Sequence, residues 1–208
     1  ARIAYVRIAL MTLPDSDPFT ANFTDLGSAL HDVFGFSELR DGQREAIEAV
    51  MEGRNVLAVM PTGAGKSLCY QLPAIVRGGL TVVISPLVAL MRDQVAALRL
   101  NGIAAATINS DLSREENVET WFAVRDGKIR LLYLSPERLM TDRMLAALSQ
   151  LDIALFAIDE AHCISQWGPA FRPEYAMLAD LRQRFPSVPI IGLTATADGA
   201  TREGIEQR

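Results

Sequence analysis

The sequence predicts an α/β protein built on a doubly wound, mainly parallel β-sheet with helices on both faces. From residue 55 onward, short apolar and β-branched runs alternate with segments of helical periodicity, which is the pattern of strand–helix–strand units. The runs are apolar almost without interruption, as expected of strands buried on both faces of a parallel sheet. The predicted strands are residues 55–60, 80–85, 104–109, 130–135, 153–159 and 190–195.

Helical spacing of apolar residues is clearest over 87–98, 118–122 and 178–185. Trp121 belongs to the second of these segments and is therefore read as a core residue. Upstream of the first strand, residues 25–34 and 43–51 read as two helices joined by GFSELRDG. We expect residues 1–24 to form an N-terminal extension and residues 25–208 to form one domain.

The composition fits a single folded domain in a reducing cytosol. Half of the 208 residues are apolar (50%), which is enough for a sizeable core. The net charge of −5 argues against a surface that binds nucleic acid throughout, but it permits a local binding site. Cys69 and Cys163 show no disulfide or metal-ligand spacing. The longest apolar runs are far shorter than the roughly 20 residues that span a bilayer, so we expect a soluble protein with no membrane contact.

The first ten residues, ARIAYVRIAL, are mildly basic and apolar. No small-residue cleavage site follows them, so we expect no signal peptide. Met11 opens a more ordinary start. Our hypothesis is that residues 1–10 are non-native or follow an upstream start codon.

The first strand runs into MPTGAGKS (residues 60–67), which enters a predicted helix. A strict phosphate-loop pattern has glycine where this chain has Met60. Gly63 and Gly65 still let backbone amides converge on a phosphate, and the helix adds its positive N-terminal end. Lys66 is expected to reach the β- and γ-phosphates of ATP, and the Ser67 hydroxyl to ligate Mg²⁺. The alternative is a glycine-rich turn with a solvated lysine. The candidate ATP-binding residues of this loop are Thr62, Gly63, Gly65, Lys66 and Ser67.

Asp159 and Glu160 follow the strongly apolar run 153–158. Ligands of a doubly wound sheet bind outside the carboxyl ends of its strands, so this pair should face the same crevice as Lys66. Asp159 is placed to hold Mg²⁺, and Glu160 to orient and deprotonate the attacking water. Acidic residues here can alternatively be solvated or cap the next helix. His162 has no second histidine or cysteine pair nearby, so we expect a hydrogen-bonding role rather than metal ligation.

The motifs MPTGAGKS, VISPLVALMRDQV, LLYLSPERL, IDEAHCISQW and LTATA resemble, in this order, those of superfamily 2 helicases. FGFSELRDGQ, CISQWG after DEAH, and FRPEY resemble more specifically the first RecA-like lobe of the RecQ family of DNA helicases, over residues 26–208. The resemblance implies a RecA-like fold and ATP-dependent unwinding with 3′-to-5′ movement, in DNA repair and recombination. It also implies single-stranded DNA and duplex junctions as partners, and the bacterial cytosol or nucleoid as location.

The resemblance assigns adenine recognition to the segment upstream of the phosphate loop. It implies that Phe36 stacks on adenine, that Arg40 contacts the nucleotide and that Gln43 reads the edge of the base. A glutamine amide donates and accepts at once, which suits N6 and N7 of adenine. Without the resemblance, GFSELRDGQ reads only as a polar loop that opens a helix.

Trp167, Phe171 and Arg172 resemble the aromatic-rich loop of the family, which senses single-stranded DNA and reports to the ATP site. Aromatic faces stack on any base, at about 1–3 kcal/mol each, and Arg172 adds positive charge. Because this loop follows Glu160 closely, DNA that orders it could reposition the water-activating acid. The alternative is a pair of core aromatics, although the Gly-Pro step between them disfavours a regular element.

The chain departs from the family in this loop. The usual Trp-Gly-His-Asp-Phe-Arg-Pro is replaced by WGPAFRP, so Pro169 and Ala170 stand in place of a histidine and an aspartate. Two polar groups that could relay the DNA signal are therefore absent. The departure leaves the strength of DNA coupling open and the class of site unchanged.

Further residues match the family's coupling and backbone-binding segments. Thr194 and Thr196 match the motif that links ATP state to lobe movement, although by themselves they could merely end a strand. Residues 135–138 match a loop whose short hydroxyls and amides suit phosphates. The candidates for nucleic-acid binding and coupling are Ser85, Pro86, His162, Trp167, Phe171, Arg172, Thr194 and Thr196.

Two other classes of function fit the same residues. An RNA helicase of the DEAD-box type would keep the chemistry and change the substrate, but FGFSELRDGQ and the aromatic loop favour DNA. A nucleotide-gated binding module would hydrolyse ATP poorly, which Lys66, Asp159 and Glu160 argue against. The resemblance also implies a second RecA-like lobe that supplies an arginine to the γ-phosphate. We expect that no residue after LTATA supplies this arginine.

Overall fold

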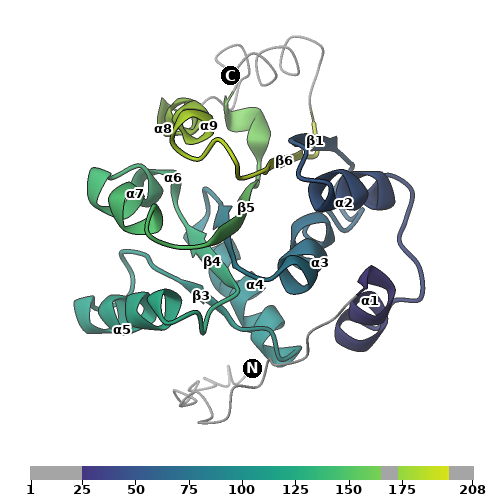
Figure 1. Cartoon of the computed structure of the whole chain (residues 1–208), viewed down its shortest axis with the longest axis horizontal. Helices are drawn as coiled ribbons and strands as arrows, with labels where there is room; N and C mark the ends of the chain where they lie inside the picture. The colour runs from purple at the N-terminus through teal and green to yellow at the C-terminus, as the bar shows by residue number, and fades with distance from the viewer. Residues whose placement is uncertain (1–24, 165–172, 197–208) are drawn as a thin grey trace, which may run out of the picture.

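The computed structural model describes residues 25–164 and 173–196. Within these residues, six parallel strands form one sheet in the order β1-β6-β5-β2-β4-β3 (Figure 1). The strands are β1 (Val56–Val59), β2 (Leu80–Ile84), β3 (Ala105–Thr107), β4 (Leu131–Leu134), β5 (Ile153–Ile158) and β6 (Ile190–Thr194). The predicted fold class is confirmed, and each predicted strand is present, with β3 shorter than expected.

The helices cover both faces of this sheet (Figure 1). They are α1 (Leu26–Phe34), α2 (Gln43–Met51), α3 (Leu68–Arg77), α4 (Val88–Leu100), α5 (Arg114–Arg125), α6 (Pro136–Leu139), α7 (Asp142–Leu148), α8 (Pro173–Ala176) and α9 (Leu181–Arg184). Two 3₁₀ turns, η1 (Ala161–Ile164) and η2 (Met177–Asp180), complete the described elements. Among the described residues, no helix has the length and apolar character needed to cross a membrane.

Local signals explain where several helices begin and end. At α5, the Ser113 hydroxyl accepts from the Glu116 amide (3.1 Å) and the Glu116 carboxylate accepts from the Ser113 amide (2.7 Å), which is a reciprocal capping box. Helix α1 begins after Asp25, whose side chain caps the helix by accepting a hydrogen bond from the Ser28 amide. It ends at Gly35, whose backbone has a left-handed conformation. The segment predicted as one helix over 178–185 is instead divided into η2 and α9. Its apolar positions are nevertheless buried as the spacing requires.

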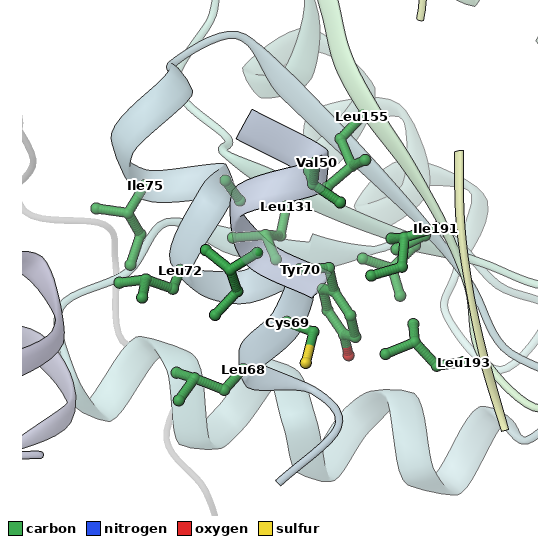
Figure 2. Close-up of a cluster of buried hydrophobic side chains, with 14 of the residues drawn as sticks. Val50, Leu68, Cys69, Tyr70, Leu72, Ile75, Leu131, Leu155, Ile191 and Leu193 are labelled. Carbon is green, nitrogen blue, oxygen red and sulfur yellow. The ribbon is translucent and has the colours of Figure 1, made fainter. Parts of the chain in front are cut away.

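Two apolar cores lie on the two faces of the sheet. Helices α1 to α4 pack on one face, where Ile47, Leu72 and Val83 are completely buried. Figure 2 shows part of this core, with labelled side chains of α2, α3, β4, β5 and β6 around Tyr70. On the other face, Val82 and Phe156 join the helices from α5 to α9. Consecutive residues such as Val82 and Val83 enter different cores because side chains of a strand alternate between faces.

Cys69 and Cys163 are both buried. Trp121 is partly buried and packs against the second core, which confirms its reading as a core residue. The apolar strands and the alternating helices thus form a sheet whose loops at one edge carry the candidate site.

Candidate active site

The candidate site lies at the carboxyl edge of the sheet. Because all strands are parallel, the residues that follow them come out at the same edge. The phosphate loop follows β1, the acidic pair follows β5, and Thr194 ends β6. Ser85 and Ser135 follow β2 and β4. The sheet order places β6 between β1 and β5, so Thr194 stands between the phosphate loop and the acidic pair.

The structure explains why Met60 can take the place of the glycine in the strict phosphate-loop pattern. The Met60 amide donates to the Thr194 carbonyl (3.0 Å), and the Met60 side chain, only 7% exposed, lies in the first core beside Cys69. Methionine therefore stands here as a core residue. Gly63 and Gly65 have φ values of 80° and 76°, which favour glycine. The curl that the loop requires is thus present without a glycine at residue 60.

Lys66 and Ser67 lie where the loop enters α3. The Lys66 ammonium donates to the carbonyl oxygens of Met60 (3.3 Å) and Pro61 (3.4 Å), so it folds back over its own loop. Ser67 is half-buried immediately before the helix. The first turn of α3 directs its backbone amides toward the loop, and this arrangement suits an anion.

The residues predicted to read adenine contact the phosphate loop. The Gln43 amide nitrogen donates to the carbonyl oxygens of Ala64 (3.0 Å) and Gly65 (3.1 Å), while its oxygen accepts from the Arg40 amide (2.9 Å). The Arg40 guanidinium donates to the Gly63 carbonyl (2.9 Å). Gln43 is 3% exposed, and a Cβ on Gly65 would lie 2.6 Å from its nitrogen. Gln43 and Arg40 therefore hold the loop.

The Phe36 side chain, by contrast, is 52% exposed, so its face is accessible to a stacking partner. The adenine contacts expected of Phe36, Arg40 and Gln43 stay predictions.

Asp159 is largely buried at the end of β5. It is 8% exposed, its amide donates to the Ile84 carbonyl (2.8 Å), and its carboxylate accepts from the Glu160 amide (3.0 Å). Burial raises the pKa of Asp159 above its usual value, and the neighbouring charge of Glu160 acts in the same direction. The charges of Lys66 and His162 oppose this rise. Both side chains are thus electrostatic neighbours of the candidate metal ligand.

Glu160 has a left-handed backbone, with a φ of 52°, and is the one non-glycine residue of this kind in the described chain. Such a conformation costs of order 1 kcal/mol or more and occurs where a site holds a side chain in a required direction. Here it accompanies the turn from β5 into η1.

His162 connects the acid to the end of β6. Its Nδ1 atom lies 3.3 Å from the Glu160 carboxylate and 2.9 Å from the Thr194 hydroxyl. The Thr194 hydroxyl donates to the Thr196 carbonyl (2.9 Å), and the Thr196 amide returns a bond to it (3.3 Å). Since Thr194 gives its only proton to Thr196, Nδ1 of His162 must be a donor. These bonds bring Glu160, His162, Thr194 and Thr196 together.

The loops predicted to bind a nucleic-acid backbone differ in accessibility. Ser85 is 2% exposed, and its hydroxyl has no hydrogen-bond partner among the residues that the structure describes, so it does not present that hydroxyl to solvent. Pro86 is half-buried beside it. The Ser135 hydroxyl accepts from the Arg138 amide (3.3 Å) and caps α6. Trp167, Phe171 and Arg172 lie outside the described residues, as do Pro169 and Ala170.

Three buried tyrosines lie behind the site and were not anticipated. The Tyr70 hydroxyl donates to the Gln94 side-chain oxygen (2.7 Å) and lies 3.3 Å from the Tyr133 hydroxyl. The Tyr175 hydroxyl donates to the Asp159 carbonyl (3.0 Å). A sequence signal existed, because a tyrosine in a buried strand or near a phosphate loop requires a partner for its hydroxyl. The identity of that partner depends on the fold.

The residues present fit ATP with Mg²⁺. Magnesium is usually bound by one or two carboxylates together with substrate phosphates, rather than by an all-protein cage. The described residues accordingly contain no group of three or more acidic, histidine or cysteine side chains that could hold a metal. Asp159 and Ser67 would supply the protein oxygens, and the phosphate loop would supply amides for the phosphates.

Sequence comparisons identify the family. Residues 40–204 match the family model for DEAD/DEAH box helicases. The chain is 50% identical over 178 residues to the ATP-dependent DNA helicase RecQ of Haemophilus influenzae, covering 86% of this chain and 29% of that protein. It is 47% identical over 180 residues to RecQ of Bacillus subtilis, covering 86% of this chain and 30% of that protein. The chain thus spans less than a third of the length of these relatives.

Structural comparisons agree on the fold. The helicase MrfA bound to DNA and AMPPNP superposes with a TM-score of 0.71 at 20% identity, over 90% of this chain and 28% of that one. The helicase Lhr of Mycobacterium smegmatis, bound to single-stranded DNA and AMP-PNP, gives 0.66 at 22% identity, over 91% of this chain and 26% of that one. The family model covers most of the chain, and the relatives with about half of their aligned residues identical are RecQ helicases. The chain therefore belongs to the DEAD/DEAH box helicase family.

Proposed function

We propose that this chain is the first motor lobe of an ATP-dependent DNA helicase that moves 3′ to 5′ along a DNA strand. It binds ATP with Mg²⁺ and single-stranded DNA, and it opens duplex junctions during repair and recombination in the bacterial cytosol. The observation that carries the proposal is the position of His162, whose Nδ1 atom lies 2.9 Å from the Thr194 hydroxyl and 3.3 Å from the Glu160 carboxylate. It thereby links the acidic pair to the strand beside the phosphate loop.

The phosphate loop performs the binding step in this proposal. The amides of residues 63–67 and the N-terminal end of α3 receive the phosphates. Lys66 exchanges the carbonyl oxygens of Met60 and Pro61 for phosphate oxygens. Its charge then offsets the negative charge that develops in the transition state. Ser67 and Asp159 would hold Mg²⁺, which supplies further charge neutralisation when bound.

Glu160 performs the proton transfer. Its carboxylate accepts a proton from the water that attacks the γ-phosphate. Nδ1 of His162 lies 3.3 Å from this carboxylate and is itself held by Thr194, so the acid has a neighbour of fixed position. A shift of Thr194 would move His162 relative to the acid. The same bonds therefore give a route by which movement at the end of β6 affects hydrolysis.

The DNA substrate rests on the sequence resemblance and on the names of the relatives, which are ATP-dependent DNA helicases. The full-length protein tests it through ATP hydrolysis with Mg²⁺, measured alone, with single-stranded DNA and with RNA of equal length. We expect stimulation by DNA and little by RNA. Equal or greater stimulation by RNA would favour an RNA helicase, and no stimulation by either would favour a nucleotide-gated binding module.

Polarity requires a separate measurement. Partial duplexes that carry a 3′ or a 5′ single-stranded tail are unwound under the same salt and ATP concentrations. We expect unwinding of the substrate with the 3′ single-stranded tail, because movement from 3′ to 5′ along that tail leads into the duplex. Preference for the other tail would overturn the proposed direction and leave the DNA substrate intact.

A further inference from the structure

Beneath the candidate site lies a polar cluster, which consists of the Tyr70 and Tyr133 hydroxyls and the side-chain amide of Gln94. Tyr70 is 1% exposed and Tyr133 is completely buried. The Tyr70 hydroxyl donates to the Gln94 oxygen at 2.7 Å and lies 3.3 Å from the Tyr133 hydroxyl. Figure 2 shows Tyr70 among the apolar side chains of this core. The cluster is therefore a polar connection within an otherwise apolar layer.

Each member of the cluster belongs to an element that carries a different part of the site. Tyr70 lies in α3, one turn after Ser67 of the phosphate loop. Gln94 lies in α4, which begins directly after the loop of Ser85 and Pro86. Tyr133 lies in β4, which leads into the Ser135 loop. One hydroxyl thus connects the nucleotide loop with the elements behind both predicted backbone-binding loops.

The cluster is also electrostatically close to the catalytic groups. Burial raises the pKa of Tyr70 well above its usual value, with Tyr133 and Asp159 acting in the same direction, while Ser67 opposes it. Burial raises the pKa of Tyr133 to about 12. Both hydroxyls therefore keep their protons at neutral pH. A buried hydroxyl that loses its partner is costly, so these elements are held in a fixed mutual arrangement.

We propose that the Tyr70 hydroxyl is a positioning group that couples the nucleotide site to the nucleic-acid backbone loops. The inference rests on the proposed function. When the phosphate loop closes on ATP, the first turn of α3 carries Tyr70 with it. The bond to Gln94 makes α4 follow, and α4 adjusts the loop of Ser85 and Pro86. DNA bound at that loop acts on the phosphate loop through the same bond, as linkage requires.

The test is ATP hydrolysis by the full-length protein as a function of single-stranded DNA concentration. Tyr70→Phe removes only the hydroxyl, and Gln94→Met removes its acceptor from the other helix. We expect either change to raise the half-saturating DNA concentration about fivefold, the size of one neutral hydrogen bond. The double variant should be no worse than Tyr70→Phe alone, because Tyr70→Phe already removes the bond to Gln94. DNA-free hydrolysis by Gln94→Met should stay within about twofold of the parent.

Arg99→Met is the matched control. Arg99 lies at the other end of α4, where its Nε donates to the Ala105 carbonyl (2.7 Å), so the variant loosens the same helix away from Tyr70. An equal effect of Arg99→Met would reduce the inference to general loosening of α4. An unchanged half-saturating DNA concentration in Tyr70→Phe and Gln94→Met would overturn it. Absence of DNA stimulation in the parent would instead count against the proposed function.

Discussion

The imidazole of His162 lies 2.9 Å from the hydroxyl of Thr194, across the boundary between β5 and β6. This bond makes the direction of Glu160 depend on the end of a neighbouring strand. It also gives the lone histidine beside the acidic pair a hydrogen-bond partner.

Thr194→Val tests that bond. Valine keeps the volume and the β-branched shape of threonine but accepts no hydrogen bond, so His162 loses its partner and Glu160 loses its orientation. We expect ATP hydrolysis to fall roughly tenfold or more, a part of the about 10²–10⁴-fold that a positioned base contributes. ATP binding, measured with a fluorescent analogue, should change little. Thr194→Ser retains the hydroxyl and should retain most of the activity; equal loss in both variants would contradict the role of this bond.

Lys66→Ala tests the phosphate loop. The Lys66 ammonium contacts carbonyl oxygens of its own loop, so its removal leaves the apolar core unchanged. We expect ATP turnover to fall at least about 10²-fold, with the thermal midpoint of unfolding nearly unchanged. Turnover within about threefold of the parent would refute the assignment. Glu160→Gln is the companion variant, which should bind ATP and hydrolyse it poorly.

Gln43→Ala separates two roles of one amide. In the structure the amide holds the carbonyl oxygens of Ala64 and Gly65, whereas the sequence resemblance assigns it to adenine. If it reads the base, the preference for ATP over GTP should fall, since discrimination depends on polar groups left unpaired by the wrong base. If it only holds the loop, both nucleotides should bind more weakly by the same factor. The two dissociation constants, measured in parallel, decide between these outcomes.

Asp159→Asn tests the electrostatic cost of the candidate metal ligand. Burial raises the pKa of Asp159, so its charged form destabilises the nucleotide-free fold at neutral pH. A group whose pKa rises on folding contributes stability below its unfolded pKa and loses it as pH rises through the folded pKa. We therefore expect Asp159→Asn to raise the thermal midpoint at neutral pH, with the gain shrinking as the solution becomes acidic.

Asp93→Asn is the control for this titration, because Asp93 is an exposed aspartate of α4. It should give no comparable gain. A pH-independent difference between Asp159→Asn and the parent would contradict the electrostatic explanation. Mg²⁺-dependent hydrolysis of ATP should be lost in Asp159→Asn whatever the pH dependence of its stability.

The sequence alone was enough to predict those features whose determining residues are adjacent in the chain. Strand β5 is an unbroken apolar run, and the phosphate loop is a contiguous glycine-containing segment at a strand end, so both could be placed without coordinates. The bond between Tyr70 and Gln94 could not, because it joins two helices that are separated by a strand. The same holds for Gln43, whose amide has several chemically suitable partners. Only the packing of α2 against the phosphate loop selects among them.

The last prediction concerns residues 1–208 in isolation. Helicases that this chain resembles close two RecA-like lobes on ATP, and the second lobe supplies an arginine to the γ-phosphate. An arginine of this kind contributes about 10³–10⁵-fold in related nucleotide hydrolases. Since residues 1–208 span 29% of the length of the Haemophilus influenzae relative, we expect them to lack that contribution when expressed alone.

We therefore expect residues 1–208 to fold cooperatively, because the described part already encloses an apolar core on each face of the sheet. They should bind ATP with Mg²⁺ weakly, and they should neither unwind duplex DNA nor hydrolyse ATP at a rate that DNA increases. The measurement compares residues 1–208 with the full-length protein, with and without single-stranded DNA at the same salt concentration. DNA-stimulated hydrolysis by residues 1–208 equal to that of the full-length protein would show that a second lobe is not needed for catalysis.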